Sequence, residues 1–287
     1  MSRIVCYIPS YNDSERAAES LATCADWDVV ISDNASDEPH RSRLAALAGD
    51  RVQLIRHERQ LGRVGNWKFC VEHFRNSDAT WMKFLSAGDR HLPETLDVFR
   101  RAIARFPEAR FFMGQIYHVR PAGRQLWKLN DQVVILPPVD AMEATARHGN
   151  IFHSLIAPLV HIDLVRDGAS FGEDILSFCA DLLYLMSVAR RAPTYFLPEP
   201  VAEMMLEYRK TLQAKKNTLE SCLEEALCRV RAADAVGELT GDRARRDALI
   251  EQSTELMHEA IERLRQPAAA PSTAAPPIAA PVGQAFA

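Results

Sequence analysis

The stretch T-W-M-K-F-L-S-A-G-D-R-H-L-P, residues Thr80 to Pro93, decides the fold class. Its apolar part, Trp81–Leu85, is short and bulky and is followed at once by small residues, which is typical of a buried strand in an α/β sheet. Ser86, Ala87 and Gly88 predict a tight exit from that strand, with Asp89 on it. Open α/β sheets bind ligands at the carboxyl ends of their parallel strands, so Asp89 is well placed to hold a metal ion. Alternatively, Asp89 shapes a turn before the next helix.

The residues before this stretch alternate between strand-like and helix-like segments. The strand-like runs are Arg3–Ile8, Trp27–Ser32 and Arg51–Arg56. Such an alternation predicts a parallel sheet with right-handed crossovers. Because the carboxyl ends of parallel strands share one edge, we expect the polar residues after the first two strands to lie on that edge: Tyr11, Asn12, Asp33 and Asn34.

Length and composition limit the class of protein. The 287 residues could form one large α/β domain with appendages or two small domains. A net charge of -4 disfavours a nucleic-acid binder that relies on a general phosphate footprint. The six cysteines show no zinc-ligand spacing and are interpreted as small core residues in a reducing compartment. No signal-peptide layout and no apolar run of membrane-spanning length is evident, which predicts a cytoplasmic protein.

Common nucleotide and hydrolase motifs are missing from the sequence. Gly62 and Gly65, in L-G-R-V-G-N-W, are expected to form a loop before a helix, but they match neither G-x-G-x-x-G nor a Walker A loop. The sequence contains no G-x-S-x-G and no H-E-x-x-H. These observations disfavour a dinucleotide enzyme, a P-loop NTPase, a serine hydrolase of the elbow type and a zincin.

Four segments, taken in order, resemble the successive motifs of the family 2 glycosyltransferases. They are P-S-Y-N at Pro9–Asn12, D-N-A-S-D at Asp33–Asp37, L-G-R-V-G-N-W at Leu61–Trp67 and K-F-L-S-A-G-D at Lys83–Asp89. The resemblance covers roughly residues 1–211. It implies a GT-A fold, which is a Rossmann-like, mostly parallel central sheet flanked by helices. It also implies inverting transfer of a sugar from a nucleotide-diphosphate donor, with Mg²⁺ or Mn²⁺ as the cation.

The resemblance also assigns roles to individual residues. Tyr11 would stack on the nucleobase, and Asp33 would accept a hydrogen bond from the base, an arrangement that suits uracil and therefore a UDP-sugar. Asp89 would lie beside the divalent cation that bridges the donor diphosphate. The other expected donor-binding residues are Pro9, Asn12, Asn34, Asn66, Lys68, Ser86, Gly88 and Arg209. The structural alternatives are a core tyrosine and an Asx turn at Asp33.

The sequence departs from the family pattern at two points. The usual metal motif is D-x-D or D-x-D-D, whereas only Asp89 supplies a carboxylate here, which predicts a weaker preformed cation site. Family members often carry a histidine after Y-R, whereas this chain has Lys210 and Thr211 after Arg209. The basic residues that follow could neutralise the diphosphate or form the solvated start of a helix.

An apolar helix is expected from Asp181 onward, with Leu182, Leu185 and Met186 on its buried face. An Asp at this point is commonly an N-terminal helix carboxylate and nothing more. The family places the general base of an inverting transfer in an E-D or A-D pair before such a helix, and Ala180 and Asp181 match that pair. Asp181 is therefore the expected base. Asp174 is the second choice.

Two further segments receive structural expectations. The segment R-H-G-N-I-F-H-S comprises residues Arg147–Ser154. In the family that the sequence resembles, such a region can touch the donor sugar or the acceptor, although His153 alone is expected to be a surface or hydrogen-bonded histidine. Thr194–Leu197 predicts a short strand before the P-E-P-V-A-E-M-M-L-E-Y-R-K segment.

The C-terminal part predicts two helices and a tail. We expect a helix hairpin at residues 212–265, with Leu219, Leu223, Leu227 and Val230 on one apolar stripe and a turn around Gly237 and Gly241. The hairpin could pack on the catalytic domain, form a homodimer or contact an acceptor carrier. The Ala/Pro-rich residues 266–287 are expected to be disordered. Residues 1–211 would then form the nucleotide-sugar-binding and catalytic domain.

The expected function is therefore an inverting glycosyltransferase acting in bacterial surface-glycan or glycoconjugate synthesis. The acceptor would be a glycan, a lipid-linked sugar or a protein, no nucleic acid is involved, and the enzyme could associate peripherally with the inner face of the membrane. A catalytically silent nucleotide-sugar-binding or scaffold protein is the alternative from another class. A nucleotidyltransferase is less favoured because its glycine- and lysine-rich phosphate loop is absent.

Overall fold

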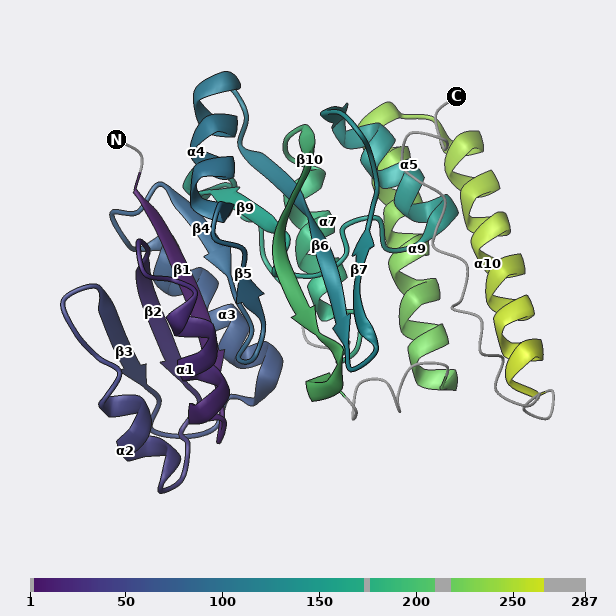
Figure 1. The fold of residues 1–287 in the computed structure, drawn as a ribbon. Coiled ribbons are helices and arrows are strands. Elements are labelled where there is room, and N and C mark those ends of the chain that lie inside the picture. Colours follow the sequence, from purple (N-terminus) through teal and green to yellow (C-terminus); the bar gives the residue numbers. More distant parts are fainter. Residues whose placement is uncertain (1–2, 173–175, 210–217, 266–287) are drawn as a thin grey trace.

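A computed structural model describes residues 3–172, 176–209 and 218–265 (Figure 1). Asp174, Lys210, Thr211 and the Ala/Pro-rich tail lie outside these ranges, as do the side chains of Tyr208 and Arg209.

The centre of the molecule is a ten-stranded sheet with the order β3-β2-β1-β4-β9-β6-β10-β5, to which β7 adds beside β6 and β8 beside β10. The strands are β1 (Ile4–Ser10), β2 (Asp28–Asp33), β3 (Val52–Arg56), β4 (Trp81–Phe84), β5 (Arg90–His91), β6 (Phe111–Arg120), β7 (Gly123–Trp127), β8 (Val134–Leu136), β9 (Pro158–His161) and β10 (Thr194–Met205). The first four strands pair in parallel, as the sequence predicts.

The second half of the sheet is mixed, but two of its strands, β6 and β10, run in the same direction as the first four. Strand β9 is antiparallel to both β4 and β6, and β10 is parallel to β6. Strands β6 and β10 therefore run in the direction of β4, and their carboxyl ends lie on the same edge of the sheet, at the bottom of Figure 1. The strand expected at Thr194–Leu197 is longer than predicted, because β10 continues to Met205 through register shifts around Pro200.

Helices flank the sheet. They are α1 (Ser14–Ala22), α2 (His40–Ala45), α3 (Gly62–Arg75), α4 (Thr95–Arg105), α5 (Pro138–His148), α6 (Ile162–Arg166), α7 (Ala180–Ala189), the 3-10 helix η1 (Leu206–Arg209), α9 (Leu219–Thr240) and α10 (Arg243–Arg265). The loop expected at Gly62 and Gly65 is wrong, because α3 begins at Gly62, whose φ of +72° suits glycine. None of the described helices is long and apolar enough to cross a bilayer.

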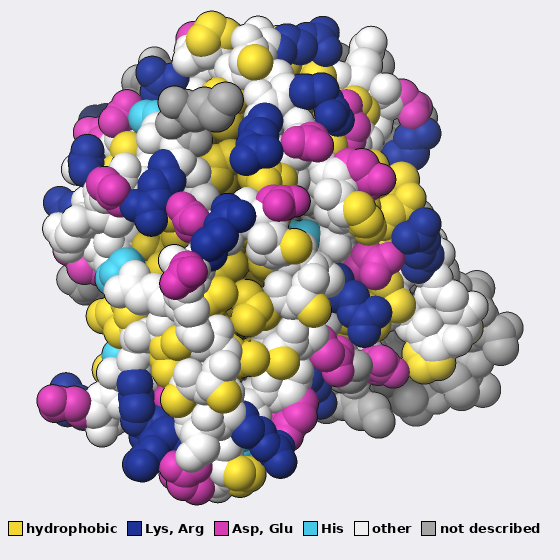
Figure 2. Space-filling model, turned by 60° about the vertical axis from the view of Figure 1, so that its left-hand side comes forward, with side chains coloured by type: hydrophobic (Ala, Val, Ile, Leu, Met, Phe, Trp, Pro, Cys, Tyr) yellow, Lys and Arg dark blue, Asp and Glu magenta, His cyan; other side chains and the backbone are white. Residues whose placement is uncertain are grey.

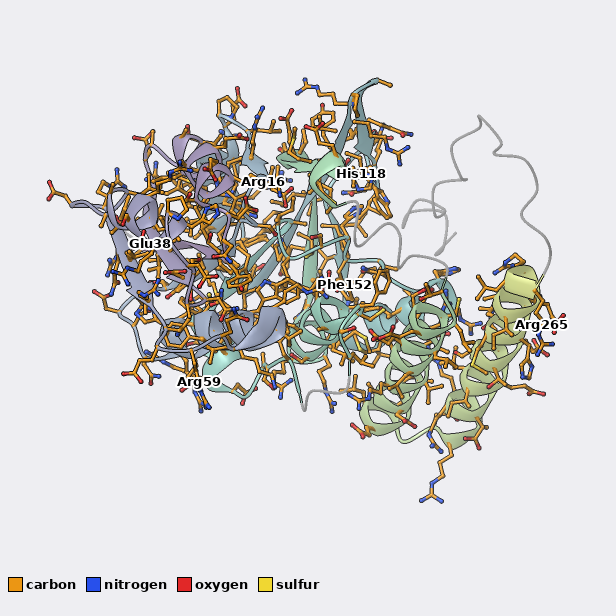
Figure 3. The ribbon with its side chains drawn as sticks, turned by 90° about the horizontal axis from the view of Figure 1, so that it is seen from below. Arg16, Glu38, Arg59, His118, Phe152 and Arg265 are labelled. Atoms are coloured by element: carbon orange, nitrogen blue, oxygen red, sulfur yellow. The ribbon has the colours of Figure 1, made fainter. Side chains whose placement is uncertain are left out.

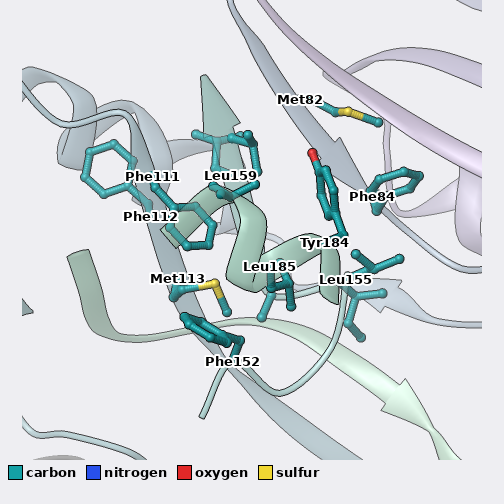
Figure 4. Packing of buried hydrophobic residues seen from close by; sticks show 14 of the residues in the cluster. Met82, Phe84, Phe111, Phe112, Met113, Phe152, Leu155, Leu159, Tyr184 and Leu185 are labelled. Atoms are coloured by element: carbon teal, nitrogen blue, oxygen red, sulfur yellow. The ribbon is translucent and has the colours of Figure 1, made fainter. Parts of the chain in front are cut away.

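Aromatic and aliphatic side chains from the strands fill the space under α7 (Figure 4). Phe111, Phe112 and Met113 of β6 are fully buried together with Tyr184 and Leu185 of α7. Burying each such side chain contributes about 1.5–3 kcal/mol. This packing holds α7 against the sheet and so determines where its first turn lies.

The C-terminal helices form the expected hairpin and pack on α5 and α7, but through a different face. Leu219 and Leu223, on the predicted apolar stripe, are exposed, whereas the buried face carries small residues such as Ala232 and Ala233. Small side chains allow the helices to approach closely. The turn forms at Gly241 alone, with a φ of +73°, while Gly237 stays inside α9 facing Arg246.

Charged side chains are dispersed over the molecular face drawn in Figure 2. Basic and acidic side chains alternate there with hydrophobic and neutral ones. That face therefore lacks a broad basic field of the kind that a phosphate backbone requires.

Candidate active site

The carboxyl ends of β1, β2 and β4 are tied together through their backbones. The amide of Asn34 donates to the carbonyl of Ser10 at 2.9 Å, and the amide of Leu85 donates to the carbonyl of Tyr7 at 2.9 Å. Figure 3, seen from below relative to Figure 1, looks onto this edge. The residues that follow these strands therefore share one side of the molecule, as expected from the sequence.

Tyr11 and Asn12 differ in what they offer a ligand. The side chain of Tyr11 is 42% exposed, and its hydroxyl accepts a hydrogen bond from Gln60. Asn12 has a φ of +50° and exchanges hydrogen bonds with Asp37 at 2.8 and 3.1 Å. The Tyr11 ring is thus available for stacking, while the Asn12 side chain maintains the turn.

Asp33 is only 1% exposed and pairs with a basic residue that the sequence analysis did not select. Arg56, at the end of β3, donates from Nη1 to Oδ2 of Asp33 at 2.6 Å and to the carbonyl of Ser36 at 3.0 Å. The amide of Ser36, three residues on, donates to Oδ1 at 2.9 Å, so Asp33 also holds the local backbone, although not through the two-residue bond of an Asx turn. Both oxygens of this carboxylate therefore accept hydrogen bonds from the protein, although a carboxylate has about four acceptor positions.

Asn34 and Asn66 are buried and serve the framework. Oδ1 of Asn34 accepts the amide of Leu61 at 2.7 Å, which fixes the start of α3. Asn66 accepts the Ser32 hydroxyl at 2.6 Å and donates to the Ser32 carbonyl at 3.1 Å. These contacts position the end of β2 against α3, so the two asparagines could influence a donor through the backbone.

The remaining expected donor-binding residues are spread over the same side. Pro9 lies in β1, Lys68 is half-buried on α3, and Ser86 and Gly88 lie in the turn after β4. The Gly88 amide donates to Ser20 Oγ at 2.9 Å, and its φ is +92°. Arg209 lies in η1.

Asp89 is 2% exposed and is held in place on both its backbone and its side chain. Its carbonyl accepts the Ser20 hydroxyl at 2.7 Å, and its Oδ1 accepts the amide of Met205 at 2.9 Å. Nearby Lys83 is fully buried, and burial lowers the pKa of its ammonium to about 8, an effect that Asp89 opposes. One carboxylate fits Mg²⁺ or Mn²⁺, since such ions commonly take one or two carboxylates and complete their shell with substrate phosphates and water.

A second group of metal-ligand side chains lies in the core of the described residues. Cys6, Cys24 and His91 are buried, with ligand atoms within 4.8 Å of one another. Thiols and imidazole suit softer metals than Mg²⁺ or Mn²⁺. This cluster therefore does not replace Asp89 as the candidate site for the donor's cation.

Asp181 lies in the first turn of α7, and its Oδ1 accepts the amide of Leu182 at 2.9 Å. The segment just before it is held by two side chains that the sequence analysis did not select. Glu224 of α9 accepts the amides of residues 177–179, and Arg63 of α3 donates to the carbonyl of Ser177. The only signal for Arg63 was its place in L-G-R-V-G-N-W, and Glu224 had none.

His153 is not the surface or hydrogen-bonded histidine expected from the sequence. It is buried, its φ is +62°, and among the described residues neither ring nitrogen has a hydrogen-bond partner. Its ring packs edge-on against Trp127 at 4.4 Å between centroids. Burial, with a smaller effect of His118, lowers the pKa of His153 to about 3, so this imidazole is neutral at physiological pH.

Solved structures of TarS from S. aureus share this fold. TarS 1-349 in complex with UDP-GlcNAc has a TM-score of 0.67 at 13% identity, covering 88% of this chain and 71% of that one. TarS 1-349 alone gives 0.63 at 13% identity, with coverages of 91% and 73%. The complex of TarS 1-349 with UDP gives 0.60 at 12% identity, with coverages of 88% and 70%.

No curated protein matches the chain. A family model does match: the model described as Glycosyl transferase family 2 covers residues 6–154, slightly more than half of the chain. The match includes the carboxyl ends of β1, β2 and β4, and the ten-stranded architecture is the GT-A fold that the sequence motifs imply. This chain belongs to the family 2 glycosyltransferases.

Proposed function

We propose that this glycosyltransferase moves a sugar from a UDP-linked donor to an acceptor hydroxyl, with inversion at the anomeric carbon and with a divalent cation. The observation that carries the proposal is the convergence of Tyr11, Asp33 and Asp89 on one edge of the sheet, with Asp89 oriented by Met205. The fold neighbour TarS, whose complexes contain UDP and UDP-GlcNAc, supports the choice of uridine.

Each residue would have a separate task. The exposed ring of Tyr11 would stack on uracil, and Asp33 would use a remaining acceptor position for the N–H of the base. Asp89 would hold the cation against the diphosphate, and the bound cation would stabilise negative charge on the departing UDP. The region from Arg147 to Ser154 would face the sugar or the acceptor.

Asp181 would act as the general base. Its carboxylate would take the proton of the acceptor hydroxyl while that oxygen forms a bond to the anomeric carbon, on the face opposite the breaking bond to UDP. The proton ends on Asp181, and the bonding pair leaves with the diphosphate. Positioned proton transfer of this kind contributes roughly 10²–10⁴ in rate.

The first test is a thermal-shift panel of UDP, GDP, CDP, dTDP and ADP, each with and without Mn²⁺. A ligand at 100 times its Kd stabilises a protein by about 2.7 kcal/mol, which is easily detected. A shift with UDP that requires Mn²⁺ is expected. A shift with another nucleotide would reject the uridine assignment, and no shift with any of them would reject the donor site.

A second candidate function is suggested by the single carboxylate of the cation site. A protein that binds UDP-sugars without turning them over would show the thermal shift but no release of UDP. Incubation with a set of UDP-sugars, followed by measurement of released UDP with and without glycan and lipid acceptors, distinguishes this binding protein from the proposed enzyme.

A further inference from the structure

Glu224 lies on the buried face of α9 and is 6% exposed. Its carboxylate accepts three consecutive backbone amides: Ser177 to Oε1 at 3.0 Å, Phe178 to Oε2 at 2.7 Å and Cys179 to Oε2 at 2.7 Å. The Ser177 hydroxyl lies 3.4 Å from Oε1. A buried carboxylate is therefore matched to the amides that lead into α7, 45 to 47 residues earlier in the chain.

Cys179 is the N-cap of α7, and Ser177 and Phe178 precede it. The first N–H groups of a helix lack partners within the helix, and a polar N-cap side chain such as Ser, Thr, Asp or Asn commonly supplies one. The N-cap residue Cys179 makes no side-chain cap hydrogen bond. Glu224 of α9 instead binds the N-cap amide and the two amides before it, and its negative charge lies at the positive end of the α7 dipole.

The same segment is also held by α3. Arg63 donates to the carbonyl of Ser177, and its guanidinium lies 5.0 Å from the centroid of the Trp67 ring. Residues 177–179 are thus clamped by α3 and by α9, the first helix of the C-terminal hairpin. Asp181 follows this clamp after one residue, in the first turn of α7.

We propose that Glu224 is a positioning residue for the candidate base. By fixing the backbone of residues 177–179, it sets the direction of the first turn of α7 and with it the carboxylate of Asp181. This inference rests on the proposed role of Asp181. It makes the C-terminal hairpin part of the catalytic apparatus rather than a separate appendage.

The test uses Glu224→Gln in the full chain. A glutamine has the same shape, but it replaces one acceptor oxygen with an N–H₂ group that faces amide donors. The matched control is Glu238→Gln, which removes the negative charge from the 2.7 Å contact of Glu238 with Arg190, also between α9 and α7 but at the other end of α7.

Two independent measurements are made on each variant. The first is hydrogen exchange of the amides of residues 177–183, which needs no substrate. The second is steady-state kinetics of UDP-sugar turnover at a temperature well below the unfolding transition, together with UDP affinity. For Glu224→Gln we expect at least tenfold faster exchange, at least tenfold lower kcat, and KM for the donor and Kd for UDP within twofold of wild type. Glu238→Gln should match wild type in all of these quantities.

Each contrary outcome has a distinct meaning. Unchanged exchange in Glu224→Gln would reject the clamp itself. Faster exchange with normal kcat would reject the positioning role and leave Glu224 as a structural anchor. Absence of turnover in the wild-type protein would instead reject the proposed function, and the catalytic meaning of the clamp with it.

A second variant covers the case in which Glu224→Gln fails to fold. Arg63 is exposed, so Arg63→Met loosens the clamp from its other side without opening the core. It should also lower kcat with little change in KM for the donor, and an unchanged kcat would overturn the inference.

Discussion

The amide of Met205, the last residue of β10, donates a 2.9 Å hydrogen bond to Oδ1 of Asp89, 116 residues earlier in the chain. This main-chain donor helps to fix the rotation of a buried carboxylate at the carboxyl edge of the sheet. Because the donor is backbone, its position depends on the pairing of β10 with β5 and β6 rather than on any side chain. The Asp89 carboxylate, the candidate cation ligand, is therefore oriented before a cation or nucleotide binds.

Replacing Asp89 by Asn removes the negative charge of the side chain but keeps an oxygen that can accept the Met205 amide. The Asn carbonyl can still accept the Met205 amide, so the fold and the unfolding temperature should change little. Removal of the negative charge should weaken Mn²⁺-dependent UDP binding at least tenfold, measured by calorimetry, with little effect on binding without metal. An unchanged affinity in the presence of Mn²⁺ would remove Asp89 from the cation site.

Asp181→Asn tests the base. The new side chain can still accept the amide of Leu182, so the first turn of α7 is retained. Donor affinity should stay the same while kcat falls by about 10²–10⁴. If transfer continues at the wild-type rate, another group takes the proton, and Asp174 would be tested next.

Arg56→Met tests the ion pair with Asp33. The substitution leaves a carboxylate that is 1% exposed without its charged donor, which should cost about 1–3 kcal/mol in urea unfolding. The control is Arg51→Met just before the same strand, whose partner Asp28 is partly exposed, and its cost should stay below about 1 kcal/mol. Equal costs for the two variants would show that the buried pair has no special role.

The buried His153 predicts a pH dependence of stability. Its pKa in the folded protein is lowered to about 3 by burial and His118, whereas an unfolded histidine titrates near 6.5. Between these values the unfolded chain binds the additional proton. The stability that the neutral ring contributes is therefore complete above about pH 6.5 and is lost as the pH falls toward 3.

His153→Asn removes this titration while tolerating the positive φ. Between pH 7 and pH 4, the wild-type protein should lose several kcal/mol more than the variant, on the order of 1.4 kcal/mol per pH unit, in urea unfolding. The exposed His258→Asn on α10 serves as the control and should follow wild type. Parallel curves of unfolding free energy against pH for wild type and His153→Asn would contradict the lowered pKa of His153.

The sequence predicts the parts of the site that follow from strand order. Short apolar runs ending in polar residues place Tyr11, Asp33 and Asp89 on one edge, because parallel strands share their carboxyl ends. The parallel pairing of the first four strands and the helices between them follow from the same alternation, and the two C-terminal helices follow from their own apolar periodicity. Such patterns describe each segment by itself and not its contacts with distant segments.

Contacts between distant segments were not predictable in this way. In the sequence, Glu224 is followed by Glu225 in a predicted helix, a pattern typical of solvent-exposed residues. In the structure it is buried and accepts the backbone amides of residues 177–179. The buried face of α9 was misassigned for a related reason. The sequence analysis assigned the buried face from large apolar residues such as Leu219 and Leu223, which are exposed in the structure. The buried face instead carries small side chains such as Ala232, because they allow the helices to pack closely.

Arg229 of α9 has a consequence for the order in which the protein is assembled. It donates to the carbonyls of Ala146 and Arg147 at the end of α5, 83 and 82 residues earlier, and a Cβ on the adjacent Gly149 would lie 2.7 Å from its guanidinium. When the chain is synthesised from its N-terminus, every strand of the described sheet emerges before Arg229 does. The last turn of α5 can therefore gain these two hydrogen bonds only after α9 has been synthesised.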